Sequence, residues 1–156
     1  MKEYTHIFAS IATAACMLAL FNVFFRLSFL YYVFLLLCGI LARTNDWLDF
    51  KYKEHERKFL THSPFSPVLI GISILIGSAM CMINVILGIY MMFVVHGVFL
   101  MHFFVDSLNP SGVPVMPKTR FKISEIPYDN LGWNILITLV SIVLICIWTL
   151  FFWIVS

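Results

Sequence analysis

Residues 68–105 read VLIGISILIGSAMCMINVILGIYMMFVVHGVFLMHFFV, a run of 38 residues that contains no Asp, Glu, Lys or Arg. About 20 helical residues cross a hydrocarbon core of roughly 30 Å, so a single helix of this length would overshoot the bilayer. Two helices that meet at a turn near Asn84 fit the run instead. This stretch therefore predicts two consecutive transmembrane helices.

The composition of the whole chain indicates that lipid is its main solvent. Of its 156 residues, 62% are hydrophobic and only 12% are charged, about half the charged share of a typical soluble domain. A soluble domain of this size would have to leave large apolar patches in water. The net charge of +2, without a block of like charges, argues against a disordered chain and against nucleic acid as a partner. We therefore expect an all-α integral membrane protein.

The remaining apolar runs complete a bundle of about five transmembrane helices in one domain over residues 1–156. The expected spans are residues 7–25, 27–42, 66–83, 85–106 and 131–155. Polar loops are expected at residues 43–65 and 107–130. With five spans, both loops lie on the same side of the membrane as the N-terminus.

The basic residues predict the orientation of this bundle. Nine of the ten Lys and Arg residues fall on the side of the two polar loops: Lys2, Arg43, Lys51, Lys53, Arg57, Lys58, Lys118, Arg120 and Lys122. Only Arg26 falls on the other side. Loops rich in Lys and Arg stay in the cytoplasm. We therefore expect a multi-pass cell-membrane protein with a cytoplasmic N-terminus and an external C-terminus.

Side chains that bind divalent metals recur at the cytoplasmic ends of the expected spans. His102 and Asp106 form the clearest pair, because a spacing of four places both on one face of a helix. Ionisable residues in a membrane segment are functional candidates by default. The alternative is a polar pair that only meets the lipid headgroups.

The two polar segments nearest these ends add further ligand-type side chains. Asp46 and Asp49 are three residues apart, which on a helical turn directs both carboxylates to nearly the same side. A solvated, highly charged loop is the alternative interpretation of this segment. In Thr-His-Ser at residues 61–63, a hydroxyl can cap the next helix while His62 faces the cytoplasmic surface. With His6 at the head of the first span, these residues supply the N and O ligands that divalent metals use.

Taken in order along the chain, four motifs resemble a known family. They are Thr5-His6, the acidic segment 45–49, the basic stretch that runs into Thr-His-Ser at 57–63, and His102-x-x-x-Asp106 followed by Gly-Val at 112–113. The pattern covers the whole chain and resembles the YdjM-like membrane-bound metal-dependent hydrolases, above all their short archaeal and archaeal-virus relatives.

The resemblance implies a divalent-metal site with one or two ions, for which zinc is the expected metal. The implied ligands are His6, Asp46, Asp49, His62, His102 and Asp106, and among them Asp46, Asp49 and His62 are the expected catalytic residues. The chain departs from the family in the spacing of its two aspartates, which leaves open which of them is the ligand. It also lacks the first histidine of the basic motif, for which His55 is the alternative.

The leading functional hypothesis is a hydrolase that acts on a phosphoester or lipid-like substrate at the cytoplasmic face. A remoter similarity to the all-α zinc phospholipase C and P1 nuclease group implies this substrate class. The expected substrate-binding residues are Arg57, Lys58, Asn109, Lys118 and Arg120, and the Pro-containing loop that carries the last three is expected to fold over the metal site as a cap. The alternative is a non-enzymatic membrane protein, either a metal transporter or a structural or lysis factor whose metal only staples the loops.

Overall fold

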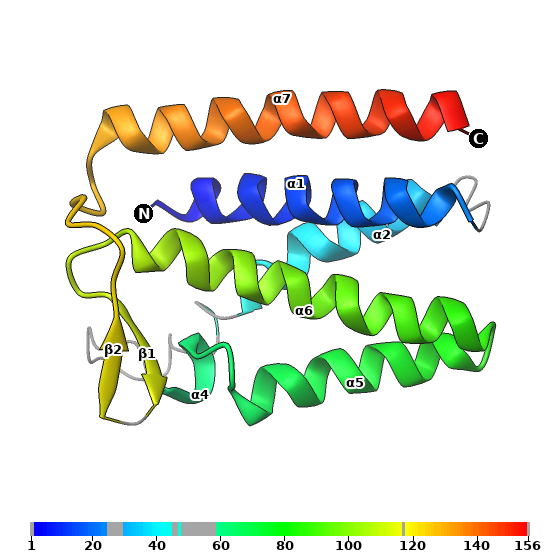
Figure 1. The fold of residues 1–156 in the computed structure, drawn as a ribbon, viewed down its shortest axis with the longest axis horizontal. Helices are drawn as coiled ribbons and strands as arrows, with labels where there is room; N and C mark the ends of the chain where they lie inside the picture. Colours follow the sequence, from blue (N-terminus) through cyan, green and yellow to red (C-terminus); the bar gives the residue numbers. More distant parts are fainter. Residues whose placement is uncertain (1, 25–29, 45–46, 48–58, 117, 156) are drawn as a thin grey trace.

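The computed structural model describes residues 2–24, 30–44, 47, 59–116 and 118–155, and these form a mostly helical protein (Figure 1). Its elements are α1 (Glu3–Asn22), α2 (Leu30–Leu41), α4 (Phe59–His62), α5 (Pro67–Cys81), α6 (Val85–Ser107), β1 (Val113–Met116), β2 (Thr119–Phe121) and α7 (Leu131–Val155). The described part of the chain thus has six helices and one two-stranded sheet.

The long apolar run of the sequence forms α5 and α6, with the turn between them at Asn84. The Asn84 side chain accepts hydrogen bonds from the backbone N–H groups of Ile86 and Leu87, at 2.9 and 3.1 Å. An Asn at this position satisfies the first free N–H groups of a helix and so marks where it starts. At the head of α5, Ser66 caps the helix and Pro67 occupies its first turn, where proline costs no hydrogen bond.

Three of the described helices are long and apolar enough to cross a membrane: α1, α6 and α7, with 20, 23 and 25 residues. The other two expected spans correspond to the shorter apolar helices α2 and α5, of 12 and 15 residues. A helix of 12 residues measures about 18 Å, well below the roughly 30 Å of a hydrocarbon core. Residues 27–29, at the expected start of the second span, lie outside the described part.

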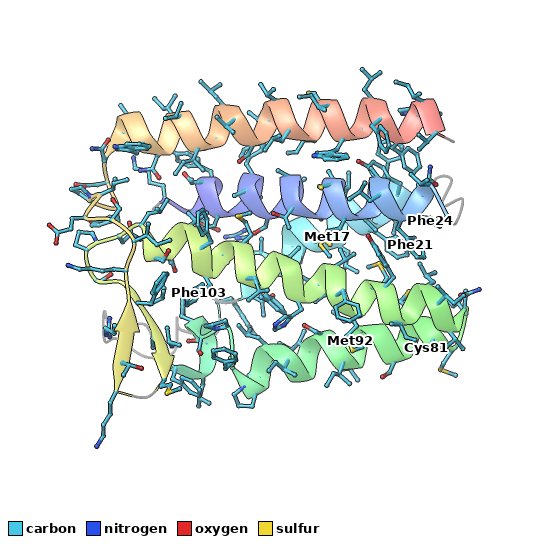
Figure 2. The ribbon with its side chains drawn as sticks, in the orientation of Figure 1. Met17, Phe21, Phe24, Cys81, Met92 and Phe103 are labelled. Atoms are coloured by element: carbon cyan, nitrogen blue, oxygen red, sulfur yellow. The ribbon has the colours of Figure 1, made fainter. Side chains whose placement is uncertain are left out.

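α1 is the central helix of the bundle, because α6 and α7 both pack along it (Figure 1). α5 packs along α6, and α2 packs against α1. Met17 and Phe21 point from α1 into the space shared with α6 (Figure 2), where Phe21 stacks on Tyr90 with ring centroids 4.0 Å apart. The main apolar core therefore forms between α1, α2 and α6, with Phe152 of α7 packed into it.

The expected polar loop at 107–130 contains a β-hairpin, which the sequence analysis did not predict. β1 and β2 pair antiparallel, with Val113 opposite Phe121, and their β-branched residues suit strands. Gly112 enters the hairpin with φ +59°, a left-handed conformation that glycine adopts without steric cost. The hairpin lies at the end of the bundle where α6 finishes and α1 and α7 begin (Figure 1).

Candidate metal centre

Three histidines from three helices converge on one carboxylate at this end of the bundle. His6 of α1, His62 of α4 and His102 of α6 surround Asp106. Their Nε2 atoms lie 3.2, 3.7 and 3.4 Å from the Asp106 carboxylate oxygens. All four side chains are at most 4% exposed, so the cluster is buried.

The spacing within this cluster suits a bound divalent cation. The ligand atoms of His6, His102 and Asp106 all lie within 4.8 Å of one another, and the three could hold a metal ion. Ligands placed 2.0–2.2 Å from a tetrahedral zinc ion lie about 3.3–3.6 Å apart, close to the separations observed here. His62 lies beside this group: its ring meets that of His102 edge-on at 5.4 Å, and its Nε2 lies 3.7 Å from the Asp106 carboxylate. It is the candidate fourth ligand.

The helices place these side chains by simple periodicity and by packing. His102 and Asp106 are one turn apart on the same face of α6, as their spacing predicts. His6 lies in the first turns of α1, and its ring stacks on that of His102 with centroids 4.2 Å apart and an interplanar angle of 22°. Because α1 packs along α6, His6 meets a pair that lies about 100 positions later in the sequence.

Contacts around the cluster orient its ligands. His102 Nδ1 lies 3.1 Å from the carbonyl oxygen of Ala42, so an N–H at Nδ1 donates to this carbonyl and leaves Nε2 directed at Asp106. Asn109 donates to the Asp106 carboxylate over 3.3 Å. His62 Nδ1 lies 3.1 Å from the Thr61 hydroxyl. Such outer partners set the tautomer and the direction of metal-binding side chains.

The loop after α6 is expected to fold over the metal site as a cap. In the structure it lies against this end of the bundle. Ile123 N–H donates to the carbonyl of Ser107 at 2.8 Å, and Ile126 N–H donates to that of Leu108 at 3.1 Å. The Ser63 hydroxyl donates to the carbonyl of Val115 at 3.1 Å. These bonds join the loop both to the end of α6 and to the Thr-His-Ser segment.

The expected site residues divide into three groups by where the structure places them. His6, His62, His102 and Asp106 come together, and the buried Asn109 joins them through Asp106. Lys118 and Arg120 are exposed on the hairpin, where the Arg120 guanidinium donates to the carbonyl of Ser111 at 3.0 Å. Asp46, Asp49, His55, Arg57 and Lys58 lie outside the described residues, so their expected roles stay predictions.

Asn134 of α7 is a supporting residue that the sequence analysis did not identify. It is fully buried, and its Oδ1 accepts hydrogen bonds from Lys2 N–H and from the Thr5 hydroxyl, both at 2.8 Å. Its Nδ2 donates to the carbonyls of Tyr128 and Asn130, at 2.9 and 2.7 Å. A single Asn near the start of an otherwise apolar span was the available signal, but its partners lie about 130 positions away.

Replacing Asn134 with Ala should lower the free energy of unfolding by about 2 kcal/mol, because the buried Thr5 hydroxyl and the Lys2 N–H both lose their acceptor. It should also weaken metal binding by about tenfold, because Thr5 precedes His6 and the change acts on a ligand indirectly. Unfolding in detergent and zinc titration would measure the two effects.

The matched control for this change is Asn130→Ala. Asn130 accepts from the Trp133 N–H and caps α7 at its first turn, so its loss should cost about 1 kcal/mol. It should leave zinc affinity unchanged, since the Asn130 side chain has no bond to α1. Equal zinc affinities for both variants would show that Asn134 does not position His6.

Comparisons of the chain with protein-family models, with curated proteins and with solved structures gave no match. The chemistry of the site is therefore argued from its own geometry. A buried set of imidazole nitrogens around one carboxylate is a donor set that suits zinc and related first-row metals.

Proposed function

We propose that the protein is a multi-pass membrane protein that uses its buried His and Asp cluster as a divalent-metal site for hydrolysis at the cytoplasmic face. The observation that carries the proposal is the convergence of His6, His62 and His102 on Asp106. Isolated buried charges are costly unless they are paired or bind metal. Three imidazoles around one carboxylate, deep in an apolar bundle, are better explained by a metal than by packing.

Zinc is the proposed metal. Imidazole and carboxylate ligands hold zinc in four-coordinate hydrolytic sites in which one position stays open. When bound, the ion supplies Lewis-acid activation of the scissile bond. Asn109 and the carbonyl of Ala42 hold Asp106 and His102 in place. Asp46 and Asp49 follow α2 in the sequence, and Ala42, which comes directly after α2, contacts His102. The two aspartates are the proposed additional ligands or general base.

The proposed substrate is a phosphoester or lipid-like molecule. The resemblance to the YdjM-like membrane-bound hydrolases favours hydrolysis as the reaction. Lys118 and Arg120 are exposed on the hairpin, at the end of the bundle that holds the cluster, and they support an anionic substrate. Together with Arg57 and Lys58, which lie outside the described residues, they are the proposed substrate contacts. Charge-assisted bonds from Arg and Lys are the usual way in which proteins hold phosphate groups.

The proposed topology has five membrane spans with the N-terminus in the cytoplasm. The three helices with the length and composition of membrane spans support it, as does the nine-to-one division of Lys and Arg. In this orientation the metal centre lies at the cytoplasmic end of α1 and α6. The hairpin and the expected basic loop then also face the cytoplasm.

A metal assay combined with a substrate screen tests the proposal. Protein purified in detergent without chelator should contain about one zinc ion per chain, or two if Asp46 or Asp49 completes a second site. It should hydrolyse phosphoesters, and a chelator should abolish this activity. Metal at well below one ion per chain would overturn the metal site.

The same experiment separates hydrolysis from a purely structural metal. The cluster links α1, α4 and α6, so a metal that only staples these helices is the second candidate function. In that case zinc should raise the unfolding temperature, while no phosphoester or lipid in the screen is cleaved. Zinc-dependent cleavage that is lost in a His62→Ala variant would exclude the staple.

A further inference from the structure

An apolar cavity of about 490 Å³ lies between α1, α6 and α7. Its volume is within the range of roughly 300–1,000 Å³ typical of ligand sites. On α1 it is lined from Ala9 to Met17, on α6 and its C-cap residue from Met101 to Leu108, and on α7 from Leu136 to Trp148. α6 and α7 both pack along α1 (Figure 1), and the cavity is a groove lined by residues of α1 and of these two helices.

One end of this groove adjoins the metal centre. Ala9 lies one helical turn after His6, and Val105 directly precedes Asp106. Ala9 and Val105 are buried together in a small apolar cluster that also contains Ile137 of α7. The groove therefore starts next to two of the expected ligands and runs from there toward the opposite end of the bundle.

The groove offers an occupant almost no polar contact. The lining contains no charged side chain among the described residues. Its two hydroxyls, Thr13 and Ser141, donate to carbonyls of their own helices, those of Ala9 at 3.1 Å and Ile137 at 2.7 Å. A cavity lined in this way stays dry and accepts apolar ligands. Water-soluble substrates have nothing to bind there.

The length of the groove matches one leaflet of a bilayer. From Leu136 to Trp148, α7 rises by about 18 Å at 1.5 Å per residue, and half of a hydrocarbon core measures roughly 15 Å. The three helices that line the groove all have the length and composition of membrane spans. An extended hydrocarbon chain that enters at the metal end therefore finds a groove of its own length.

The charges of the described residues fit an anionic amphiphile whose charged end lies at the metal centre and whose hydrocarbon chain lies in the groove. The described Lys and Arg residues all lie in the segments around the metal end, and they are Lys2, Arg43, Lys118, Arg120 and Lys122. The described residues that line the groove include no Lys or Arg. We propose that the groove binds an acyl chain of an anionic membrane lipid and so holds its phosphoester headgroup at the metal centre. This inference rests on the proposed hydrolase function and names its substrate as a lipid.

Photolabelling tests the inference on the full-length protein. The probe is phosphatidylglycerol with a diazirine in one acyl chain, added to protein in detergent micelles after metal removal with a chelator. We expect labelled residues on the groove-lining faces of α1, α6 and α7, mapped by mass spectrometry, and one lipid retained per chain. Labels confined to outward-facing residues, such as Leu139 or Val143, would overturn the inference.

A groove-filling variant and its matched control sharpen this test. Ala12→Leu with Ser141→Leu places larger side chains in the groove and should reduce labelling of its lining at least tenfold. Ser78→Leu with Ala79→Leu makes the same two changes at exposed positions of α5 and should leave labelling unchanged. Equal labelling of the two variants would overturn the inference, and the labelled positions in the wild type decide the question if the first variant does not fold.

Hydrolysis assays with metal present separate this inference from the proposed function. The groove-filling variant should cleave phosphatidylglycerol at least tenfold more slowly than the wild type, but should cleave p-nitrophenyl phosphate, which has no acyl chain, at an unchanged rate. Undiminished cleavage of the lipid would overturn the lipid-binding role of the groove but not the proposed hydrolase function. Lipid labelling in the groove without cleavage of any substrate would overturn the proposed hydrolase function but not the lipid-binding role of the groove. A dimer that the groove-filling variant dissociates would make a second copy of the chain the occupant and overturn the inference.

Discussion

The Asp106→Asn protein is expected to bind zinc at least ~100-fold more weakly than the wild type, since changes to residues that only contact metal ligands already cost about 10–100-fold. Asp106 is the one group that all three histidines approach. Asn has the same shape but no negative charge, and its amide N–H₂ cannot coordinate a cation. The variant therefore loses the anionic ligand without opening a cavity, and keeps only a neutral carbonyl oxygen at that position.

Thermal unfolding in detergent reports this loss directly. At a free zinc concentration of 100 times the wild-type Kd, binding should stabilise the wild type by about 2.7 kcal/mol. At the same zinc concentration, a ~100-fold weaker variant should gain only about 0.4 kcal/mol. The control is Asp129→Asn, which changes an exposed carboxylate and should keep the full zinc-dependent shift. An undiminished shift in Asp106→Asn would exclude Asp106 as a ligand.

Replacing Gly88 with Leu is expected to destabilise the protein by about 3 kcal/mol, the upper end of the usual cost of overpacking. Gly88 faces the closest approach of α5 and α6. A Cβ atom there would lie 2.6 Å from the carbonyl oxygen of Gly77 and would also meet the backbone N and Sγ of Cys81. Because two of these atoms belong to the backbone, α5 and α6 would have to move apart.

Gly71→Leu is the matched control, since Gly71 lies in α5, the helix that Gly88 of α6 packs against, and a Cβ there has no neighbour within 4 Å. Leu is a better helix former than glycine by about 1 kcal/mol, so this variant should be at least as stable as the wild type. Chemical unfolding of the two variants in detergent would measure the difference. Equal destabilisation would show that the loss of glycine, rather than the close contact of α5 and α6, decides the result.

The local features of this protein were readable from its sequence because they depend on neighbouring residues. The absence of charge over residues 68–105 predicts two helices with a turn near Asn84, and α5 and α6 follow that pattern. The four-residue spacing of His102 and Asp106 places both side chains on one helical face. The β-hairpin at 113–121 was missed, because its strands are short and the first of them contains Pro114.

The sequence also indicated which ligand-type residues belong to one end of the bundle, since topology alone brings the ends of consecutive spans together. His6 and His62 were expected near His102 for this reason, and they lie there. Topology specifies the end of a bundle but not which side chains face each other.

Only the tertiary structure decided the contacts between segments that are far apart in the chain. The bonds of Asn134 to Thr5 and Lys2 depend on how α7 packs along α1. The bond of His102 to the carbonyl of Ala42 depends on where α2 ends. The apolar groove exists because α6 and α7 both pack along α1 with small residues such as Ala9 and Ala12 between them. Periodicity predicts which face of a helix is apolar, but the rotation and separation of neighbouring helices follow from side-chain packing across the whole bundle.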